Sequence, residues 1–185
     1  MTKIKDVLVS LKAMTSSDVT DEYLSWLSDP KINKHLEVRF NIPSKAEAID
    51  FVRGFDHKVA YMFLICDTTA NLDIGTAIIR VDPNNRTANW GYLIGNIDYW
   101  GTKAGVDAIY LLMNFTFDVL NLRKVSGGAH ITNTGSIFNF YKMGFVQEGR
   151  LRAAALVNGI ETDVLLFRML KSEWIEFRKR LEASA

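Results

Sequence analysis

Apolar and polar residues alternate in several short stretches of this chain, and a two-residue period is typical of strands. The predicted strands span residues 7–11, 60–67, 74–81, 87–95, 124–131, 146–156 and 163–169. In other stretches apolar residues recur every three or four positions, which predicts amphipathic helices. These helices are expected to begin near residues 18, 30, 44, 101–105, 137 and 172.

Local signals sharpen some of these boundaries. Ser44 followed by Glu47 predicts a capping box at a helix start, and Pro30 directly after an aspartate is typical of a first helical turn. The turn at residues 82–85 favours a hairpin between two of the strands. Because strands and helices are mixed and no linker divides the chain, we expect an α+β fold with a single domain over residues 1–185.

Composition excludes several classes of protein. Hydrophobic residues make up 48% of the 185 residues, which argues against disorder. The 22 basic and 21 acidic residues give a net charge of +1, so no general footprint for nucleic acid or a membrane surface is present. The N-terminus lacks the apolar core of a signal peptide, and no apolar run reaches the ~18 residues that span a bilayer. We therefore expect a cytoplasmic protein.

The single cysteine, Cys66, excludes an internal disulfide framework and a cysteine-rich zinc site. It lies in an apolar run, so we expect a buried structural thiol rather than a nucleophile. No metal site is expected.

One stretch, residues 92–120, combines an apolar strand, a short loop with glycines and a long amphipathic helix. Unpaired N–H groups and the helix dipole favour an anion at such a helix start. Neither the Gly-Lys-Ser/Thr ending of a Walker loop nor the dinucleotide fingerprint is present. A phosphate or pyrophosphate site is therefore one interpretation, and an ordinary strand–helix connection is the other.

Three separated segments together resemble the GNAT superfamily of acyl-CoA N-acyltransferases. Trp100–Gly105 stands where the family has Arg/Gln-x-x-Gly-x-Gly/Ala, although Lys103 replaces the first glycine and Trp100 replaces Arg/Gln. Asn133–Phe145 is similar to the family's Asn-x-x-Ser/Ala…Lys-Leu-Gly-Phe signature. The third segment, residues 158–174, resembles the closing hairpin of the branch of ribosomal-protein N-terminal acetyltransferases and amino-sugar N-acetyltransferases.

The resemblance implies a mostly antiparallel sheet of about seven strands flanked by helices, and acetyl-CoA as cofactor. Loop amides would hold the pyrophosphate, and the second segment would contact the pantetheine arm. The residues that the resemblance assigns to coenzyme A are Leu93, Ile94, Gly95, Trp100, Gly101, Thr102, Lys103, Ala104, Gly105, Val106, Asn133, Ser136 and Phe140.

The implied reaction is direct attack of an amine on the acyl thioester, and it needs an oxyanion donor, a base and an acid. The resemblance points to splayed, bulged backbone N–H groups around residues 93–95 as the donor. The glutamate that several relatives carry before the Gly-Tyr pair is missing, because Asn89 and Trp90 stand there. Candidate bases are His130, Glu37, Asp98 and His35.

His130 is the first choice of base, because an unperturbed imidazole has a pKa near ~6.5. A satisfied core histidine, or a water chain without a single base, is the alternative. Relatives often place an acidic tyrosine seven residues after the Asn, where this chain has Phe140. Tyr141 follows one position later, rotated by about 100° on a helix. It is the candidate acid or else a packing residue.

The acceptor site is expected around Glu37 and Arg39. Arg39 would clamp a phosphate or carboxylate and Glu37 a hydroxyl or amine, unless the two form a solvated surface pair. Trp90 and Tyr92 offer a stacking surface for a sugar or base, or simply core packing. The run from His35 to Phe40 looks most like enzymes that acetylate nucleotide-linked amino sugars for surface polysaccharides.

We therefore expect an acetyl-CoA-dependent N-acetyltransferase acting on a nucleotide-linked amino sugar. The alternatives are acetylation of protein N-termini and acyl-CoA binding without turnover. The expected partner is a small-molecule amine, with no nucleic acid and no membrane. A homodimer is compatible with the sequence.

Overall fold

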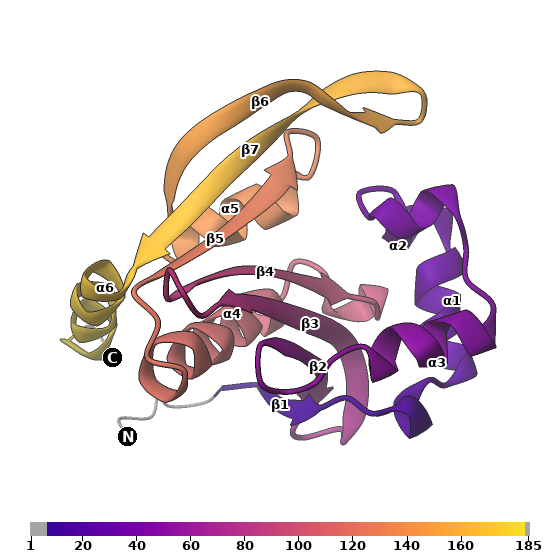
Figure 1. Ribbon diagram of the computed structural model, residues 1–185, viewed down its shortest axis with the longest axis horizontal. Coiled ribbons are helices and arrows are strands. Elements are labelled where there is room, and N and C mark those ends of the chain that lie inside the picture. Colours follow the sequence, from indigo (N-terminus) through magenta and orange to yellow (C-terminus); the bar gives the residue numbers. More distant parts are fainter. Residues whose placement is uncertain (1–6, 184–185) are drawn as a thin grey trace.

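Seven strands form one sheet in the computed structural model, which describes residues 7–183 (Figure 1). The strand order is β1-β2-β3-β4-β5-β7-β6, and every neighbouring pair is antiparallel except β4–β5. The predicted α+β class, with about seven mostly antiparallel strands, is confirmed. The strands are β1 (Val9–Ala13), β2 (Ala60–Asp67), β3 (Leu72–Asp82), β4 (Thr87–Ile94), β5 (Lys124–His130), β6 (Val146–Val157) and β7 (Ile160–Leu170).

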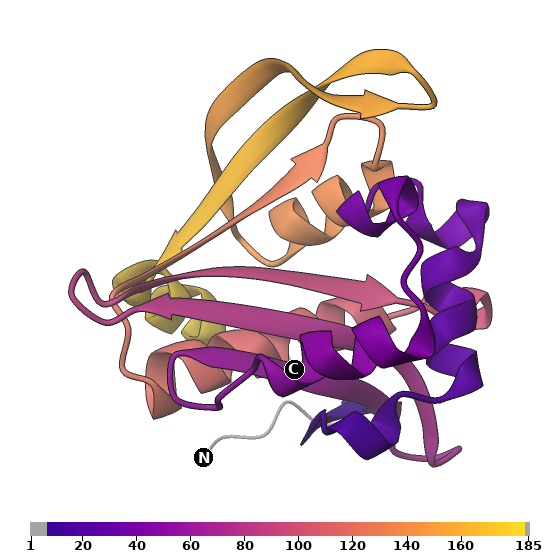
Figure 2. The same cartoon turned by 45° about the vertical axis from the view of Figure 1, so that its right-hand side comes forward.

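The sheet splits between its only two parallel neighbours among the described strands. β4 and β5 pair over Thr87–Asn89 and Lys124–Ser126 and then separate. Figure 2 shows the two strands leaving a common point and diverging toward the side where α1–α3 lie. The rest of β4 therefore has a strand partner, β3, on one side only.

Helices cover both faces of the first half of the sheet. On one face lie η1 (Ser16–Asp18), α1 (Asp21–Ser28), α2 (Pro30–Asn33), η2 (Glu37–Phe40) and α3 (Lys45–Arg53). The other helical segments are η3 (Ile97–Tyr99), α4 (Ala104–Asn114), the π turn η4 (Phe115–Val119), α5 (Thr134–Lys142) and α6 (Lys171–Ala183).

Alternation along β2 divides the core into two clusters. Met62 and Leu64 face the helices α1 and α3, whereas Phe63 and Ile65 face α4. Successive strand residues point to opposite faces of the sheet. One strand can therefore contribute alternate side chains to both clusters.

Most predicted boundaries agree with the structure, and the capping box of Ser44 and Glu47 is present. The short helix begins at Thr134, earlier than predicted, because the Asn133 side chain caps it by accepting a hydrogen bond from the Ser136 N–H. The central helix is regular only to Asn114 and continues as the π turn. Within residues 7–183, no helix is long and apolar enough to cross a membrane.

Candidate active site

A cavity of about 610 Å³ opens where β4 and β5 diverge. One side of it is formed by β4, β5 and the first turns of α5, and we call this side the cofactor half. The other side is formed by α1, η2, α3 and the parts of β2 and β3 that face them, and we call it the acceptor half. His130, at the end of β5, contributes to the lining.

The open edge of β4 supplies backbone donors to the cofactor half. The sequence predicted that the Gly95 N–H would be free to bind the cofactor. Instead, this N–H donates to the Ile74 carbonyl at 2.9 Å. Hydrogen-bonded and non-hydrogen-bonded residue pairs alternate along an antiparallel ladder, so Ile94 and Tyr92 belong to non-hydrogen-bonded pairs with β3. Their N–H groups therefore point away from β3, toward the gap between β4 and β5. The register of the β3–β4 ladder runs unbroken to Ile94. Directly after it, the N–H groups of Gly95 and Asn96 both donate to the Ile74 carbonyl, at 2.9 and 3.1 Å, so the irregularity expected in this region lies at the very end of the strand.

The loop after β4 is fixed by side chains before α4 begins. The Trp100 indole N–H donates to the Ile94 carbonyl at 2.8 Å, which ties the loop to the strand end. Gly101 has φ +74°, a left-handed conformation that favours glycine. The Thr102 hydroxyl accepts from the Ala104 N–H at 3.2 Å, and the Lys103 ammonium lies 3.5 Å from the Asp107 carboxylate.

The first turn of α4 has the features of an anion site. The Asp107 N–H makes the first intrahelical bond, to the Lys103 carbonyl, so the amides of Gly105 and Val106 lie before the hydrogen-bond ladder starts. A Cβ on Gly105 would lie 2.7 Å from the Asn139 amide nitrogen, so glycine lets α4 approach α5 closely. The same Asn139 nitrogen donates to the Tyr92 hydroxyl at 2.9 Å.

The helix α5 brings three predicted residues to the cavity and turns one away. Asn133, Ser136 and Phe140 all line it. Tyr141 is 52% exposed, and its hydroxyl donates to the Gln147 side chain at 2.9 Å. One position along a helix rotates a side chain by about 100°, so the Tyr141 hydroxyl lies outside the cavity and does not fit the expected role as acid.

Trp90 and Tyr92 line the cavity but are not a free stacking surface. Their rings stack on each other with centroids 5.8 Å apart, and Trp90 also contacts Phe140 and Phe145, each at 5.5 Å. Burial raises the pKa of Tyr92, while the hydrogen bond from Asn139 acts in the opposite direction. The core-packing interpretation is therefore the better one for both rings.

Two histidines meet at the cavity. The ring centroids of His35 and His130 lie 5.5 Å apart in an edge arrangement, and His35 Nε2 lies 3.0 Å from the Thr132 hydroxyl. His130 is 9% exposed, and its Nδ1 has no hydrogen-bond partner among the described residues. Burial lowers the pKa of His35 to about 4 and also lowers the pKa of His130, and the charge of Arg39 acts in the same direction.

The sequence predicted that the Arg39 guanidinium would bind a ligand, but in the structure the guanidinium is engaged by the protein itself. Its Nη1 donates to the Leu36 carbonyl and its Nη2 donates to the Leu156 carbonyl of β6 at 2.8 Å. Glu37 Oε1 lies 3.3 Å from Nη1, but this carboxylate is 82% exposed at the edge of the cavity. The segment 35–41 thus spans the acceptor half, held by Arg39 to β6 and by His35 to Thr132.

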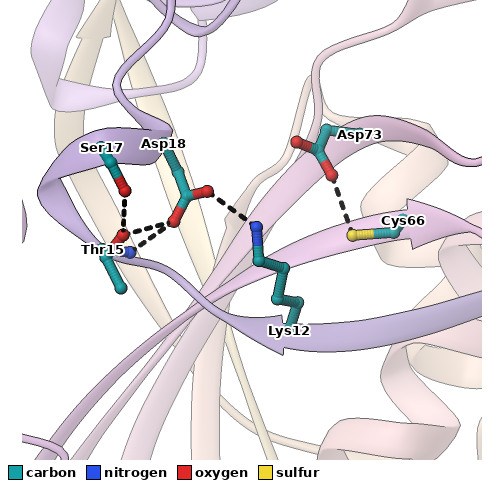
Figure 3. A network of polar contacts seen from close by, with 6 residues as sticks. All are labelled: Lys12, Thr15, Ser17, Asp18, Cys66 and Asp73. Atoms are coloured by element: carbon teal, nitrogen blue, oxygen red, sulfur yellow. Dashed lines mark hydrogen bonds and ion pairs between the residues drawn. The ribbon is translucent and has the colours of Figure 1, made fainter.

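Two other residues from the sequence analysis lie away from this site. Asp98 is exposed on η3 and is not among the residues that line the cavity. Cys66 is half-buried on β2, and its thiol donates to the Asp73 carboxylate at 2.9 Å, close to the Lys12–Asp18 ion pair (Figure 3). Burial raises the pKa of the Cys66 thiol to about 12, so it stays protonated.

Comparisons with known proteins agree with this geometry. The sequence profile of a family described as "Acetyltransferase (GNAT) domain" matches residues 9–146. The chain belongs to this GNAT acetyltransferase family. An N-acetyltransferase of Bacillus licheniformis, named p20 and called uncharacterized, is 28% identical over 170 residues, which cover 90% of this chain and 94% of that one.

Two other relatives carry more specific names. A protein of Bacillus subtilis called putative ribosomal N-acetyltransferase YdaF is 32% identical over 95 residues, or 51% of each chain. The crystal structure of spermidine N-acetyltransferase from Vibrio cholerae in complex with CoA and spermine superposes with a TM-score of 0.82. That pair is 20% identical, and the match covers 92% of this chain and 99% of the other, so it supports the fold.

As a GNAT enzyme, the protein is an acetyl-CoA-dependent N-acetyltransferase. The residues present fit this cofactor, because the free edge of β4 offers amides to the pantetheine arm and the first turn of α4 offers amides to the pyrophosphate. Asn133 and Ser136 also line the cavity.

Sequence reasoning missed the Asn139–Tyr92 hydrogen bond and the edge contact between His35 and His130. The members of each pair lie 47 and 95 positions apart in the chain, respectively, and no local pattern joins them. A signal existed only for the histidines, since both were already candidate bases.

Proposed function

We propose that the protein acetylates a primary amine of a small molecule held in the acceptor half, by direct attack of the amine on the thioester. Bound acetyl-CoA supplies the electrophilic carbonyl for this attack. The observation that carries the proposal is the position of His130, whose Nδ1 is buried at the cavity without a partner among the described residues.

His130 serves as the general base in this proposal. An ammonium has no lone pair, so the amine must lose a proton before or during attack. Because its pKa is lowered by burial, His130 is neutral at pH 7 and is able to accept that proton. The N–H groups of Tyr92 and Ile94 at the open edge of β4 are the backbone donors proposed for the developing negative charge.

The nature of the amine is the part that relatives leave open. The sequence favours a nucleotide-linked amino sugar, whereas two relatives carry the names spermidine N(1)-acetyltransferase and putative ribosomal N-acetyltransferase. Arg39, the residue expected to bind the sugar's phosphate, is held by the Leu36 and Leu156 carbonyls, which weakens that choice. Two carboxylates at the cavity, Glu37 and Glu47, suit a cationic amine of any kind.

Thiol release from acetyl-CoA by the purified protein tests the proposal. The panel contains nucleotide-linked amino sugars, spermidine, peptides with free N-termini and simple monoamines. We expect turnover with at least one small amine and loss of about 100-fold or more in His130→Gln, with acetyl-CoA binding retained. Tight acetyl-CoA binding with no thiol release for any amine would instead support the non-catalytic alternative.

A further inference from the structure

The walls of the acceptor half are largely apolar. Phe51 projects from α3, Leu36 and Val38 come from the segment 35–41, and Leu27 and Met62 lie on α1 and β2. Phe51 is 49% exposed although it is a large aromatic residue, and its ring contacts Phe55 with centroids 5.2 Å apart. Exposed apolar surface inside a concave site gains free energy when a ligand covers it.

The charged side chains that line this half are acidic, and Arg39 lies just behind them. Among the residues described by the structure, no lysine or arginine lines the cavity, and its charged side chains are those of Glu37 and Glu47. Hydrogen bonds from the Ser44 hydroxyl and N–H lower the pKa of Glu47, so it is ionised at neutral pH. Burial raises the pKa of Tyr23 to about 12, so its phenol stays neutral. Such a site attracts a cationic amine and repels phosphate or carboxylate groups.

The carboxylates contribute less to affinity than the walls do. Glu37 is solvent-exposed and already lies 3.3 Å from Arg39 Nη1, and an exposed ion pair contributes little free energy. Glu47 has one carboxylate oxygen engaged in the cap of α3. A second ammonium on the acceptor therefore gains little, whereas an apolar group covering Phe51, Leu36 and Val38 gains more.

We infer that the acceptor is a small primary amine carried on an apolar body, either an aromatic ring or a branched alkyl group. The amine is turned toward His130, and the apolar body packs between Phe51 and Val38. This inference rests on the proposed function, because it specifies the substrate of the same site.

Steady-state thiol release with matched amines tests the inference. The acceptors are 2-phenylethylamine, ethanolamine as a polar amine of similar reactivity, spermidine, a UDP-linked amino sugar and a short peptide with an N-terminal phenylalanine. We expect kcat/KM for 2-phenylethylamine to exceed that for each of the others by about 10-fold or more, since a buried aromatic ring contributes at least that much.

Two wall variants locate the effect. Phe51→Ser and Val38→Ala should each raise KM for 2-phenylethylamine by roughly 5-fold or more, while KM for ethanolamine stays within about 2-fold. Phe138→Ser is the matched control, because Phe138 is an exposed aromatic residue on α5 outside the cavity lining. Thermal unfolding of all three variants separates loss of folding from loss of substrate contact.

Several outcomes would overturn the inference. A higher kcat/KM for spermidine, together with its loss in Glu37→Gln, would show a polyamine site. Preference for the UDP-linked sugar or for the peptide would assign the site to that class of acceptor. Equal rates for ethanolamine and 2-phenylethylamine would show that the apolar walls do not select for an apolar group on the acceptor. The proposed function holds in each of these cases except preference for the peptide, which would favour acetylation of protein N-termini. Only the absence of thiol release with every amine removes both.

Discussion

In the cofactor half of the cavity and the neighbouring first turn of α4, the candidate binding groups are mainly backbone N–H groups, whereas in the acceptor half they are side chains, many of them on short helices. The edge of β4 and the first turn of α4 offer N–H groups whose positions are fixed by strand pairing and by the loop bond of Trp100. A backbone N–H is present whatever side chain its residue carries, which fits the departure of Lys103 from the family pattern. Trp100 departs from the pattern too, but its indole N–H ties the loop to the end of β4.

The acceptor half is fixed by a few individual contacts. The segment 35–41 is held by the bonds of Arg39 to Leu156 and of His35 to Thr132, which link it to the other part of the split sheet. A single substitution can therefore reshape this half without changing the fold. From this difference we expect substitutions in the acceptor half to affect acceptor binding more than cofactor binding, and four predictions test it.

The largest effect is expected at the base. His130→Gln should lower kcat/KM by about 100-fold or more with little change in KM for acetyl-CoA, because a general base contributes on the order of 10²–10⁴-fold. Because the pKa of His130 is lowered, its neutral form persists below pH 6.5. The wild-type rate should therefore decrease as the pH is lowered because the acceptor amine becomes protonated, and not because His130 does. The measurement is the pH dependence of kcat/KM for acceptor amines of different pKa. The pH at which kcat/KM falls should shift with the pKa of the amine.

The control for this prediction is Asp98→Asn, since Asp98 lies outside the cavity lining and should leave the rate within about 2-fold. Equal rates in His130→Gln and the wild type would assign proton removal to water.

The second effect concerns the junction of the two halves. A Cβ on Gly95 would lie 2.1 Å from the ring of Trp26 on α1, so Gly95→Ala should lower the free energy of unfolding by about 1–3 kcal/mol. Gly91→Ala is the matched control, because a Cβ there meets nothing within 4 Å. Urea unfolding measures both variants. Equal unfolding midpoints for Gly95→Ala and the wild type would mean that α1 moves away from residue 95 with no loss of stability.

The third effect is confined to the acceptor half. Arg39→Met removes the bonds to Leu36 and Leu156 but keeps an unbranched side chain. We expect KM for the amine to rise by about 10-fold, in line with the loss of buried charged hydrogen bonds, while KM for acetyl-CoA stays unchanged. A rise in both constants would contradict the separation of the two halves.

The smallest effect distinguishes two tyrosines. Tyr92→Phe removes the hydrogen bond with Asn139 beside the α4 start and should raise KM for acetyl-CoA by about 3-fold. Tyr141→Phe removes only the contact with Gln147 outside the cavity and should leave kcat and KM unchanged. A large loss of kcat in Tyr141→Phe would restore its expected role as the acid.

Local patterns in the sequence predicted much of the fold and part of the site. Period-two alternation marked the strands, the Ser44–Glu47 pair marked the start of α3, and the glycines before residue 105 marked the strand–helix turn. Each of these signals depends on neighbours within a few positions, which one chain segment carries by itself. The resemblance to GNAT enzymes rests on the same segments, and it is confirmed.

Only the tertiary structure decided how distant side chains meet. It placed His35 against His130, engaged Arg39 with carbonyls instead of a ligand, and turned Tyr141 out of the cavity. A one-residue step changes the direction of a helical side chain by about 100°, and contacts between segments 95 or 117 positions apart depend on packing of the whole sheet. No local period encodes such contacts. The sequence could therefore point to the segment around Glu37 as part of the acceptor site, but not to the contacts that hold this segment in place.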